Sequence, residues 1–411
     1  MLVVVSALCG QDAFGAQTQS AGKRPLVEQY LISGELKQGE QFLLEHLKKQ
    51  PNDDEARFGL GVLQFMQSVE HLMQSLHKHG LALKTSWLGM PFLRLPTPPN
   101  PKPEPISYEQ MRKIYETLLN DLTRAEATLA KVKGKDVKLP LHMGLLRLDF
   151  NGDGIVDEEE AFWKIYARVS RNRQITAETV ERFAISFDKA DVHWLRGYCH
   201  LLSALTEFIL AHDWKEAFDR TGHLFFEKVD SPFQFLNKKP RKHIWWDSET
   251  EIVDFIAFIH LINYPVKEPA RMKSALSHLE SVIAQSRENW KAIESETDDD
   301  NEWIPNPKQT GVIPGVRVTQ SIIDGWKEFL DEAEAILKGD KLIPHWRVDD
   351  GRGVNLRKVF THPKRFDLIL WIQGSAAEPF LEHGTLTEKK FWQRFRRIFG
   401  GNFFGYAVWF N

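Results

Sequence analysis

The twelve residues from Asp149 to Glu160 have the types and the spacing of a site for a divalent cation. The candidate ligands are Asp149, Asn151, Asp153, Ile155, Asp157 and Glu160. Hard cations such as Ca²⁺ bind six to eight oxygens at about 2.3–2.6 Å, which alternate residues of a tight turn can supply. Gly154 allows the bend, Ile155 would donate its backbone carbonyl, and Glu160 would close the shell with both carboxylate oxygens. The segment therefore predicts a calcium site.

This segment resembles the calcium loop of the EF-hand superfamily. Its side-chain donors stand at loop positions 1, 3, 5, 9 and 12, Gly154 stands at position 6, and the apolar Val156 stands at position 8. The resemblance covers only residues 149–160 and their flanks, and it implies a helix on each side. Pro140 limits the first helix to residues 141–148, and the second is expected over 158–170. An ion-free turn that caps the second helix is the alternative.

The sequence contains no second loop of this kind, although EF-hand sensors usually come in pairs. The acidic run 298–302 lacks a glycine at the bend, so we expect a solvated loop there rather than another ion site. Residues 349–353 contain aspartates but no glutamate that could close a shell. A single loop in an exported protein would meet a steady calcium concentration, and we therefore expect a structural ion rather than a switch.

Six histidines lie between residues 193 and 260 in the middle third of the chain: His193, His200, His212, His223, His243 and His260. Zinc sites favour closer spacings with cysteine or acidic partners, so we interpret these residues as packed or surface histidines. An acid/base cleft near His200, His212 and Trp246 would instead indicate a hydrolase. The sequence contains no nucleophile elbow, phosphate-binding glycine loop or CxxC motif, so catalytic residues are not assigned.

Composition narrows the class of protein. The chain has 411 residues, of which 42% are hydrophobic and 27% charged. These proportions exclude a polytopic membrane protein, a collagen-like fibre and a fully disordered chain, and the length allows two or three domains. The formal net charge of −3 gives no overall basic excess, so nucleic acid is not an expected partner.

The N-terminus suggests export. An apolar run over residues 2–9 and a small-x-small triplet over 13–15 are typical of a signal peptide, which we place at residues 1–20, although no basic residue precedes the run. A buried N-terminal strand is the alternative. We therefore expect a periplasmic or extracellular protein. Cleavage would remove Cys9 and leave Cys199 as a packed, inert thiol with no disulfide.

Helical spacing of apolar residues over 26–67 predicts antiparallel helix pairs. The pattern resembles a tetratricopeptide repeat and the start of the next one, on the residues Tyr30, Gly39, Leu43, Pro51, Ala56, Leu60 and Gly61. The resemblance implies that residues 21–90 form a helical region that presents a groove to a protein or peptide. An ordinary helical hairpin is the alternative.

The middle of the chain is expected to be helical behind a proline-rich strap at residues 91–106. Ser107 and Gln110 form a capping-box pattern at the start of a long helix. Further helices are predicted over 158–170, 176–188, 191–212, 250–262, 268–293 and 317–338. We group residues 107–345 as a helical domain that contains the acidic loop.

The last segment, residues 346–411, is expected to be a small α+β element packed on the helical domain. Short aromatic and β-branched runs predict strands at 366–373 and 403–410, with a helix over 387–399 between them. That helix is basic and amphipathic, so it could lie on an anionic membrane. We favour a core packing of its aromatic residues, with the basic residues in solvent.

Taken together, the sequence predicts a mainly α, multi-helical bundle with repeat-like N-terminal helix pairs, a single EF-hand-type loop and a small C-terminal α+β element. The expected function is that of an exported calcium-binding protein, with a structural ion and a non-catalytic binding or scaffold role. The alternative is a calcium-stabilised hydrolase with a cleft rich in histidine and tryptophan.

Overall fold

The computed structural model describes residues 24–81, 97–164, 184–238, 250–312, 317–400 and 403–410. The predicted signal peptide lies outside these residues, as do His243 and Trp246.

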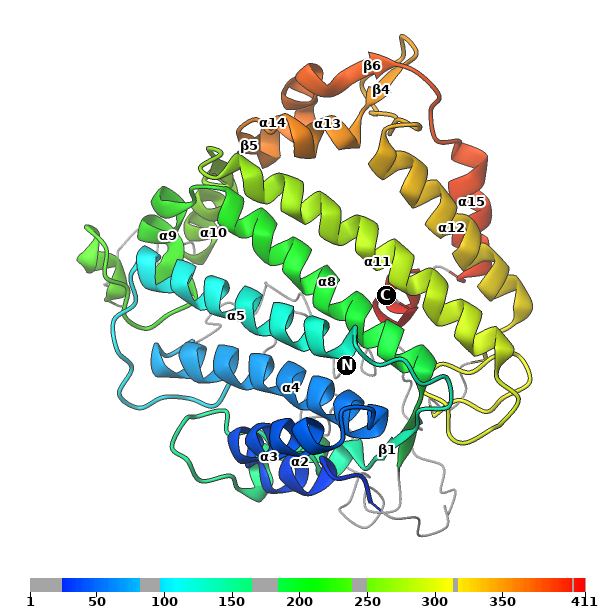
Figure 1. The fold of residues 1–411 in the computed structure, drawn as a ribbon. Helices are drawn as coiled ribbons and strands as arrows, with labels where there is room; N and C mark the ends of the chain where they lie inside the picture. The colour runs from blue at the N-terminus through cyan, green and yellow to red at the C-terminus, as the bar shows by residue number, and fades with distance from the viewer. Residues whose placement is uncertain are drawn as a thin grey trace.

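A row of long helices forms the body of the protein, and the prediction of a mainly α fold is confirmed (Figure 1). Neighbours in the row pack side by side in the order α3, α4, α5, α8, α11, α12 and α15. Their bounds are Leu36–Lys49 for α3, Asp54–Lys78 for α4, Tyr108–Leu129 for α5, Lys189–Ala211 for α8, Pro269–Ser295 for α11, Gln320–Lys338 for α12 and Lys389–Ile398 for α15. A short helix, α2 (Glu28–Ser33), precedes α3. None of the described helices combines the length and the apolar character needed to cross a membrane.

Local capping explains where several of these helices begin. The predicted capping box of α5 is present, because Ser107 Oγ accepts from the Gln110 N–H at 3.1 Å and Gln110 Oε1 accepts from the Ser107 N–H at 2.7 Å. Asp53 and Asp188 cap α4 and α8 in a similar way, each accepting hydrogen bonds from the first turn.

Shorter elements surround this row. The short α-helices are α9 (Lys215–Thr221), α10 (Thr250–His260), α13 (Leu356–Thr361), α14 (Leu368–Gln373) and α16 (Phe403–Phe410). The two-stranded sheets, all antiparallel, are β1 (Leu139–Leu141) with β2 (Ile185–Phe187), β3 (Asn263–Tyr264) with β5 (Phe366–Asp367), and β4 (Arg352–Val354) with β6 (Leu381–His383). The 3₁₀ helices are Met143–Leu145, Glu158–Glu160, Gly222–Leu224, Gln234–Asn237 and Ser375–Phe380.

The N-terminal helices approach each other closely at glycines. A Cβ atom on Gly39 would lie 2.6 Å from the Cβ of Tyr30 and 2.7 Å from Cδ1 of Leu63, so α2, α3 and α4 require glycine there. A Cβ atom on Gly61 would lie 2.4 Å from Cδ2 of Leu129, which brings α4 equally close to α5. The tetratricopeptide resemblance and its peptide groove remain predictions.

The described part of the proline-rich strap, residues 97–105, forms neither helix nor strand. The Glu104 N–H donates to the Lys78 carbonyl at 3.0 Å, and Ile106 forms a parallel bridge with Val229. The strap therefore lies along the end of α4 before α5 begins.

One prediction in the middle of the chain is wrong. Residues 184–188 belong to the predicted helix 176–188, but 185–187 form strand β2, and residues 176–183 lie outside the described part of the chain. Asp188 has an extended backbone, with φ −133° and ψ −157°, because it caps α8. The residues before such a cap are directed away from a continuing helix.

Both strands predicted for the C-terminal segment are also wrong. Only Phe366 and Asp367 are in a strand, because Asp367 accepts from the Leu370 N–H at 2.9 Å and so starts α14. Residues 403–410 form α16, in which Trp409 and Phe410 are fully buried. A helix that is apolar on every side lacks the periodicity that separates helix from strand in a sequence.

The C-terminal helices complete the main apolar core. The Phe410 ring packs edge-on against Trp290 of α11 at 4.7 Å and against Trp326 of α12 at 5.3 Å, both measured between ring centroids. Phe395 of α15 stacks on Phe329 of α12 at 5.2 Å. The aromatic face of the basic helix α15 is thus occupied by core contacts, as we favoured from the sequence.

Candidate metal centre

The backbone of the acidic loop turns sharply at its glycines. Gly152 and Gly154 have φ angles of +74° and +77°, in the left-handed region that favours glycine. A Cβ atom built on Gly154 would have no neighbour within 4 Å, so the backbone angle alone requires glycine there. The bend therefore falls at the sixth position, where the calcium-loop pattern places it.

The side chains of the first half of the loop fold inward over its backbone. Asp149 Oδ1 accepts from the Gly152 N–H at 2.6 Å, and its Oδ2 accepts from the Gly154 N–H at 3.0 Å. Asn151 and Asp153 each accept from the N–H two residues on, at 2.8 Å. These hydrogen bonds fix the side chains of Asp149, Asn151 and Asp153 to the loop backbone.

The last residue of the loop closes it against the first. Glu160 Oε1 accepts from the Phe150 N–H at 2.9 Å, and Oε2 accepts from the Asp157 N–H at 3.3 Å. Asp149 and Glu160 are only 9% and 8% exposed, whereas Asp153 and Asp157 are exposed. The two ends of the loop thus meet at a buried base, and its middle faces solvent.

Helix α4 holds the loop in place through two side chains that the sequence analysis did not identify. Glu70 Oε2 accepts from the Asp149 N–H, and Gln74 Nε2 donates to the Asp149 carbonyl, both at 2.9 Å. Side chains of α4 therefore hold both the backbone N–H and the backbone carbonyl of Asp149. No local pattern could have revealed these contacts, because they join residues more than seventy positions apart.

The negative charges at this base affect one another. Burial, followed by the charges of Asp149 and Glu160, raises the pKa of Glu70 to about 7. Burial also raises the pKa of Glu160, with further contributions from Asp149 and Asp157. On the exposed side of the loop, Nζ of Lys164 lies 2.9 Å from Oε1 of Glu159. The loop base thus concentrates negative charge that a divalent cation would neutralise.

The flanks of the loop differ from the helices implied by the EF-hand resemblance. The predicted helix at 141–148 is wrong, since this stretch contains the end of β1 and the 3₁₀ turn Met143–Leu145. After the loop, Glu158–Glu160 form a 3₁₀ turn and residues 162–164 are helical, and 165–170 lie outside the described residues. Arg147 and Ala161 form an antiparallel bridge, and the Phe162 N–H donates to the Leu146 carbonyl at 2.9 Å. The two flanks therefore close the loop by pairing with each other.

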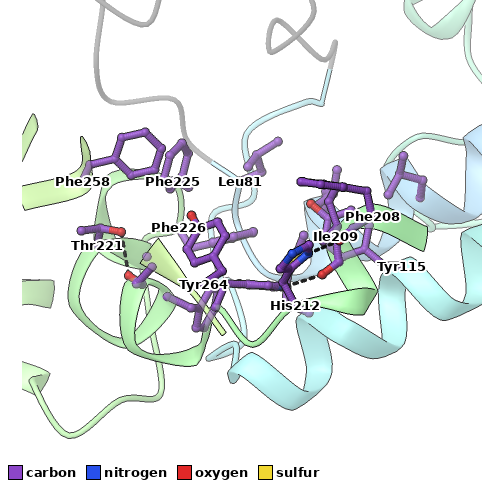
Figure 2. A pocket seen from close by; sticks show the side chains of 17 residues that line it. Leu81, Tyr115, Phe208, Ile209, His212, Thr221, Phe225, Phe226, Phe258 and Tyr264 are labelled. Carbon is purple, nitrogen blue, oxygen red and sulfur yellow. Dashed lines mark hydrogen bonds between the residues drawn. The ribbon is translucent and has the colours of Figure 1, made fainter. Parts of the chain in front are cut away.

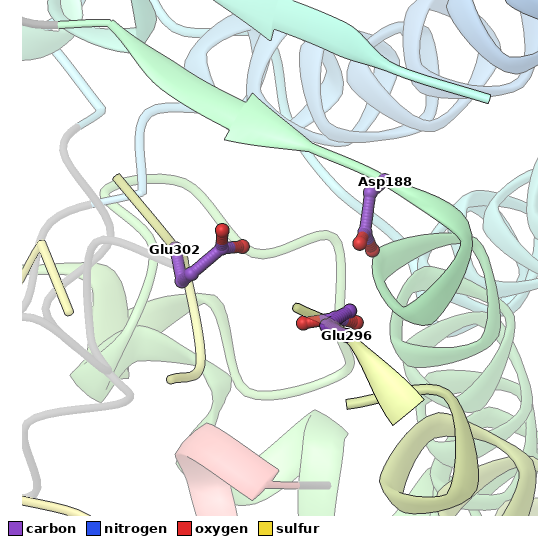
Figure 3. Close-up of side chains that lie close together, drawn as sticks. All are labelled: Asp188, Glu296 and Glu302. Carbon is purple, nitrogen blue, oxygen red and sulfur yellow. The ribbon is translucent and has the colours of Figure 1, made fainter. Parts of the chain in front are cut away.

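Three acidic residues outside the loop have carboxylate oxygens that lie close to one another. Within the described residues, only Asp188, Glu296 and Glu302 form a group of three potential metal-binding side chains, from His, Cys, Asp and Glu, with all ligand atoms within 4.8 Å (Figure 3). The carboxylates of the acidic loop are therefore more widely spaced than this trio. We name these three residues the acidic trio.

The acidic trio corrects the prediction of a solvated loop at 298–302. Glu302 is 4% exposed, although Asp298 and Asp300 of the same run pair with Lys138 at the surface. Burial, followed by the charge of Asp188, raises the pKa of Glu296 to about 8, and burial raises that of Glu302 to about 7. These two carboxyls therefore retain their protons to a higher pH than an ordinary glutamate does. In the acidic trio, Asp188 lies between β2 and α8, and Glu296 and Glu302 lie on the two sides of residue 299. No spacing in the sequence therefore predicted that these three residues come together.

The described histidines have separate partners. His193 Nδ1 contacts Gln285 Oε1 at 2.9 Å, and His200 Nδ1 contacts Nδ1 of His278 at 3.0 Å. His212 Nδ1 donates to the Phe208 carbonyl at 2.8 Å. His223 lies 3.5 Å from Asp254, and His260 is exposed. The interpretation of packed or surface histidines agrees with these contacts.

Cys199 and His212 are two further residues that could take part in catalysis. Cys199 is 1% exposed, and burial raises its pKa, which opposes formation of the reactive thiolate. His212 lines an apolar cavity whose described lining contains no carboxylate. The acid/base pair of the hydrolase alternative is therefore not assembled around His212.

No protein-family model, curated protein or solved structure shows significant similarity to this chain. The function must therefore be argued from the residues of the acidic loop and their contacts.

Proposed function

We propose that this is a calcium-binding, non-catalytic helical protein in which one Ca²⁺ at residues 149–160 acts as a structural clip. The observation that carries the proposal is the attachment of Asp149 to α4 through both its N–H and its carbonyl. An ion bound by the loop would therefore be connected directly to the helical body. Export to a calcium-rich compartment, predicted from the N-terminus, belongs to the same proposal.

The residues present fit the ion by type and by backbone shape. Asp149, Asp153, Asp157 and Glu160 supply negatively charged oxygens, and Asn151 and the Ile155 carbonyl supply neutral ones; these six residues would hold the ion. Bound Ca²⁺ would supply positive charge at the loop base, where burial and, to a lesser extent, neighbouring carboxylates raise the pKa of both Glu70 and Glu160.

The clip would stabilise a stretch with little regular structure. Between β1 and β2, the described residues 142–164 contain only two 3₁₀ turns and a short helical piece. Val156 contacts the α2–α3 turn, since a Cβ on Gly34 would lie 2.7 Å from the Val156 methyl carbons. The loop thus contacts both α4 and the α2–α3 turn. Ligand that is present at 100 times its dissociation constant stabilises a fold by about 2.7 kcal/mol.

Isothermal titration calorimetry of the metal-stripped full chain with CaCl₂ tests the proposal. We expect one ion per chain, with a dissociation constant of about 10⁻⁴–10⁻³ M if the loop resembles extracellular modules. Glu160→Gln removes one negative ligand and should weaken binding at least tenfold, whereas Glu296→Gln, in the acidic trio, should leave it unchanged. Loss of binding in Glu296→Gln with retention in Glu160→Gln would place the ion in the trio and contradict the proposal. Absence of binding by the parent chain would also contradict it.

A further inference from the structure

A large apolar cavity lies where α9 and α10 meet the C-terminal ends of α4 and α8 and the N-terminal end of α5. It has a volume of about 390 Å³ and is lined by side chains from α4, α5, α8, α9 and α10 (Figure 2). Protein interiors are normally packed with few voids larger than a water molecule, and an engineered cavity of about 150 Å³ already binds benzene. A cavity of this size is within the range of sites that bind small molecules.

The lining is apolar apart from a few polar tips. Seventeen described residues line the cavity, and none of them is Asp, Glu, Lys or Arg. Three of the polar groups are already satisfied: Trp214 Nε1 donates to the Ile209 carbonyl at 3.2 Å, Thr221 Oγ1 to the Ala217 carbonyl at 2.7 Å, and His212 Nδ1 to the Phe208 carbonyl at 2.8 Å.

Three polar atoms of the lining have no hydrogen-bond partner among the described residues: Nε2 of His212 and the hydroxyls of Tyr115 and Tyr264. Because the Nδ1 of His212 donates a proton, its Nε2 is an acceptor in the neutral ring. Burial lowers the pKa of His212, which favours the neutral form. The tyrosine hydroxyls can donate or accept. Tyr115 lies on α5 and Tyr264 lies on β3.

We infer that this cavity binds a neutral, mostly hydrocarbon molecule that carries one hydroxyl group. Its hydrocarbon part would pack on the ring and aliphatic side chains, including Phe208, Phe218 and Leu76. Its hydroxyl would donate to His212 Nε2 and accept from a tyrosine hydroxyl, which satisfies polar atoms that are otherwise unpaired.

The absence of charged side chains in the described lining disfavours other classes of ligand. An anion such as a fatty carboxylate would be buried without a cationic partner, which is energetically costly. A pure hydrocarbon would fill the space but leave the three polar atoms unpaired. A ligand with a single hydroxyl avoids both costs.

Fluorescence of the neutral probe N-phenyl-1-naphthylamine, with the full chain, tests this inference. We expect saturable enhancement of the probe and displacement by 1-decanol. The methyl ether of decanol, which cannot donate, should compete about 2- to 10-fold less well, as expected for one lost hydrogen bond. Decanoate at pH 8 should compete least. Failure of the probe to bind, or decanoate competing as well as decanol, would overturn the inference.

Two variants locate the binding. Tyr115→Phe combined with Tyr264→Phe keeps the shape of the cavity, so the probe should still bind, but decanol and its ether should both compete about 2- to 10-fold less well, because each loses the hydrogen bond donated by a tyrosine. Tyr30→Phe, on α2, is the matched control and should leave competition by decanol and by its ether unchanged. Ala217→Phe should fill the cavity and weaken probe binding at least tenfold. Unchanged competition by decanol in the double variant, or unchanged probe binding in a folded Ala217→Phe variant, would overturn the assignment. If Ala217→Phe does not fold, the double variant still decides.

Discussion

The acidic loop and the acidic trio are both groups of carboxylates, but they differ in how their charge is accommodated. In the loop, Asp149, Asp153 and Asp157 accept hydrogen bonds from backbone N–H groups, which hold these carboxylates in place. In the trio, burial and mutual repulsion raise the pKa of Glu296 and Glu302 to about 8 and about 7. Carboxylates that lie close together therefore do not by themselves indicate a cation site, because burial can keep them protonated.

The largest expected effect concerns pH and the trio. The pKa of Glu296 is raised from about 4.5 to about 8, so the folded state binds this proton more tightly than the unfolded state. The resulting stability is complete below pH 4.5 and is lost as the pH rises through 8, by an amount on the order of 2–4 kcal/mol. Urea unfolding of the parent chain and of Glu296→Gln at pH 5 and 8.5 measures this loss. Glutamine resembles the protonated carboxyl, so the variant should lose less stability between pH 5 and 8.5. Equal losses in the parent chain and the variant would show that the pKa of Glu296 is not raised.

The next effect concerns calcium and the loop. Asp149→Asn should abolish the calcium-dependent stabilisation, which is about 2.7 kcal/mol at 100 times the dissociation constant. Thermal unfolding with CaCl₂ and with EDTA, in the parent chain and in this variant, provides the measurement. Glu296→Gln is the control and should keep the full calcium effect at pH 6. An equal calcium response in Asp149→Asn would show that this carboxylate is not a ligand.

A smaller effect comes from the loop backbone. Gly154→Ala should destabilise the chain by about 1–2 kcal/mol in EDTA, since φ is +77° and no neighbouring atom contributes. Gly154→Asn should cost less, because asparagine tolerates this region better. Chemical unfolding of both variants compares them. Equal stability of the parent and Gly154→Ala would mean that the loop adopts another backbone conformation.

The smallest effect concerns the contact with α4. Gln74→Ala removes the hydrogen bond to the Asp149 carbonyl and should cost about 1 kcal/mol. Ser75→Ala, the next residue on the helix, is the matched control and should change stability by less than about 0.5 kcal/mol. Unfolding in urea distinguishes the two. A Gln74→Ala variant as stable as the control would remove the support for docking of the loop.

Local patterns predicted what depends on neighbours in the sequence. The Ser107–Gln110 capping box and the glycine bend at Gly154 were both correct, because each is determined within a few residues. The helices around α8, α11 and α12 followed from apolar periodicity. These features position the loop but do not reveal what holds it.

Features that depend on distant contacts were missed. The apolar run 403–410 is a helix whose Phe410 packs against Trp290 and Trp326, and those contacts are invisible in the sequence. Glu70 and the acidic trio likewise join segments that are far apart along the chain. Asp367, which caps α14, carried a local signal that could have corrected the strand predicted at 366–373.

Amide hydrogen exchange of the full chain, with and without calcium, tests the central claim most directly, because it reports both binding and its location. We expect calcium to slow exchange at residues 149–162 and in the adjoining part of α4 near Glu70 and Gln74. Slowing confined to residues 296–302 and the start of α8, or no slowing anywhere in the chain, would contradict a calcium clip at the loop.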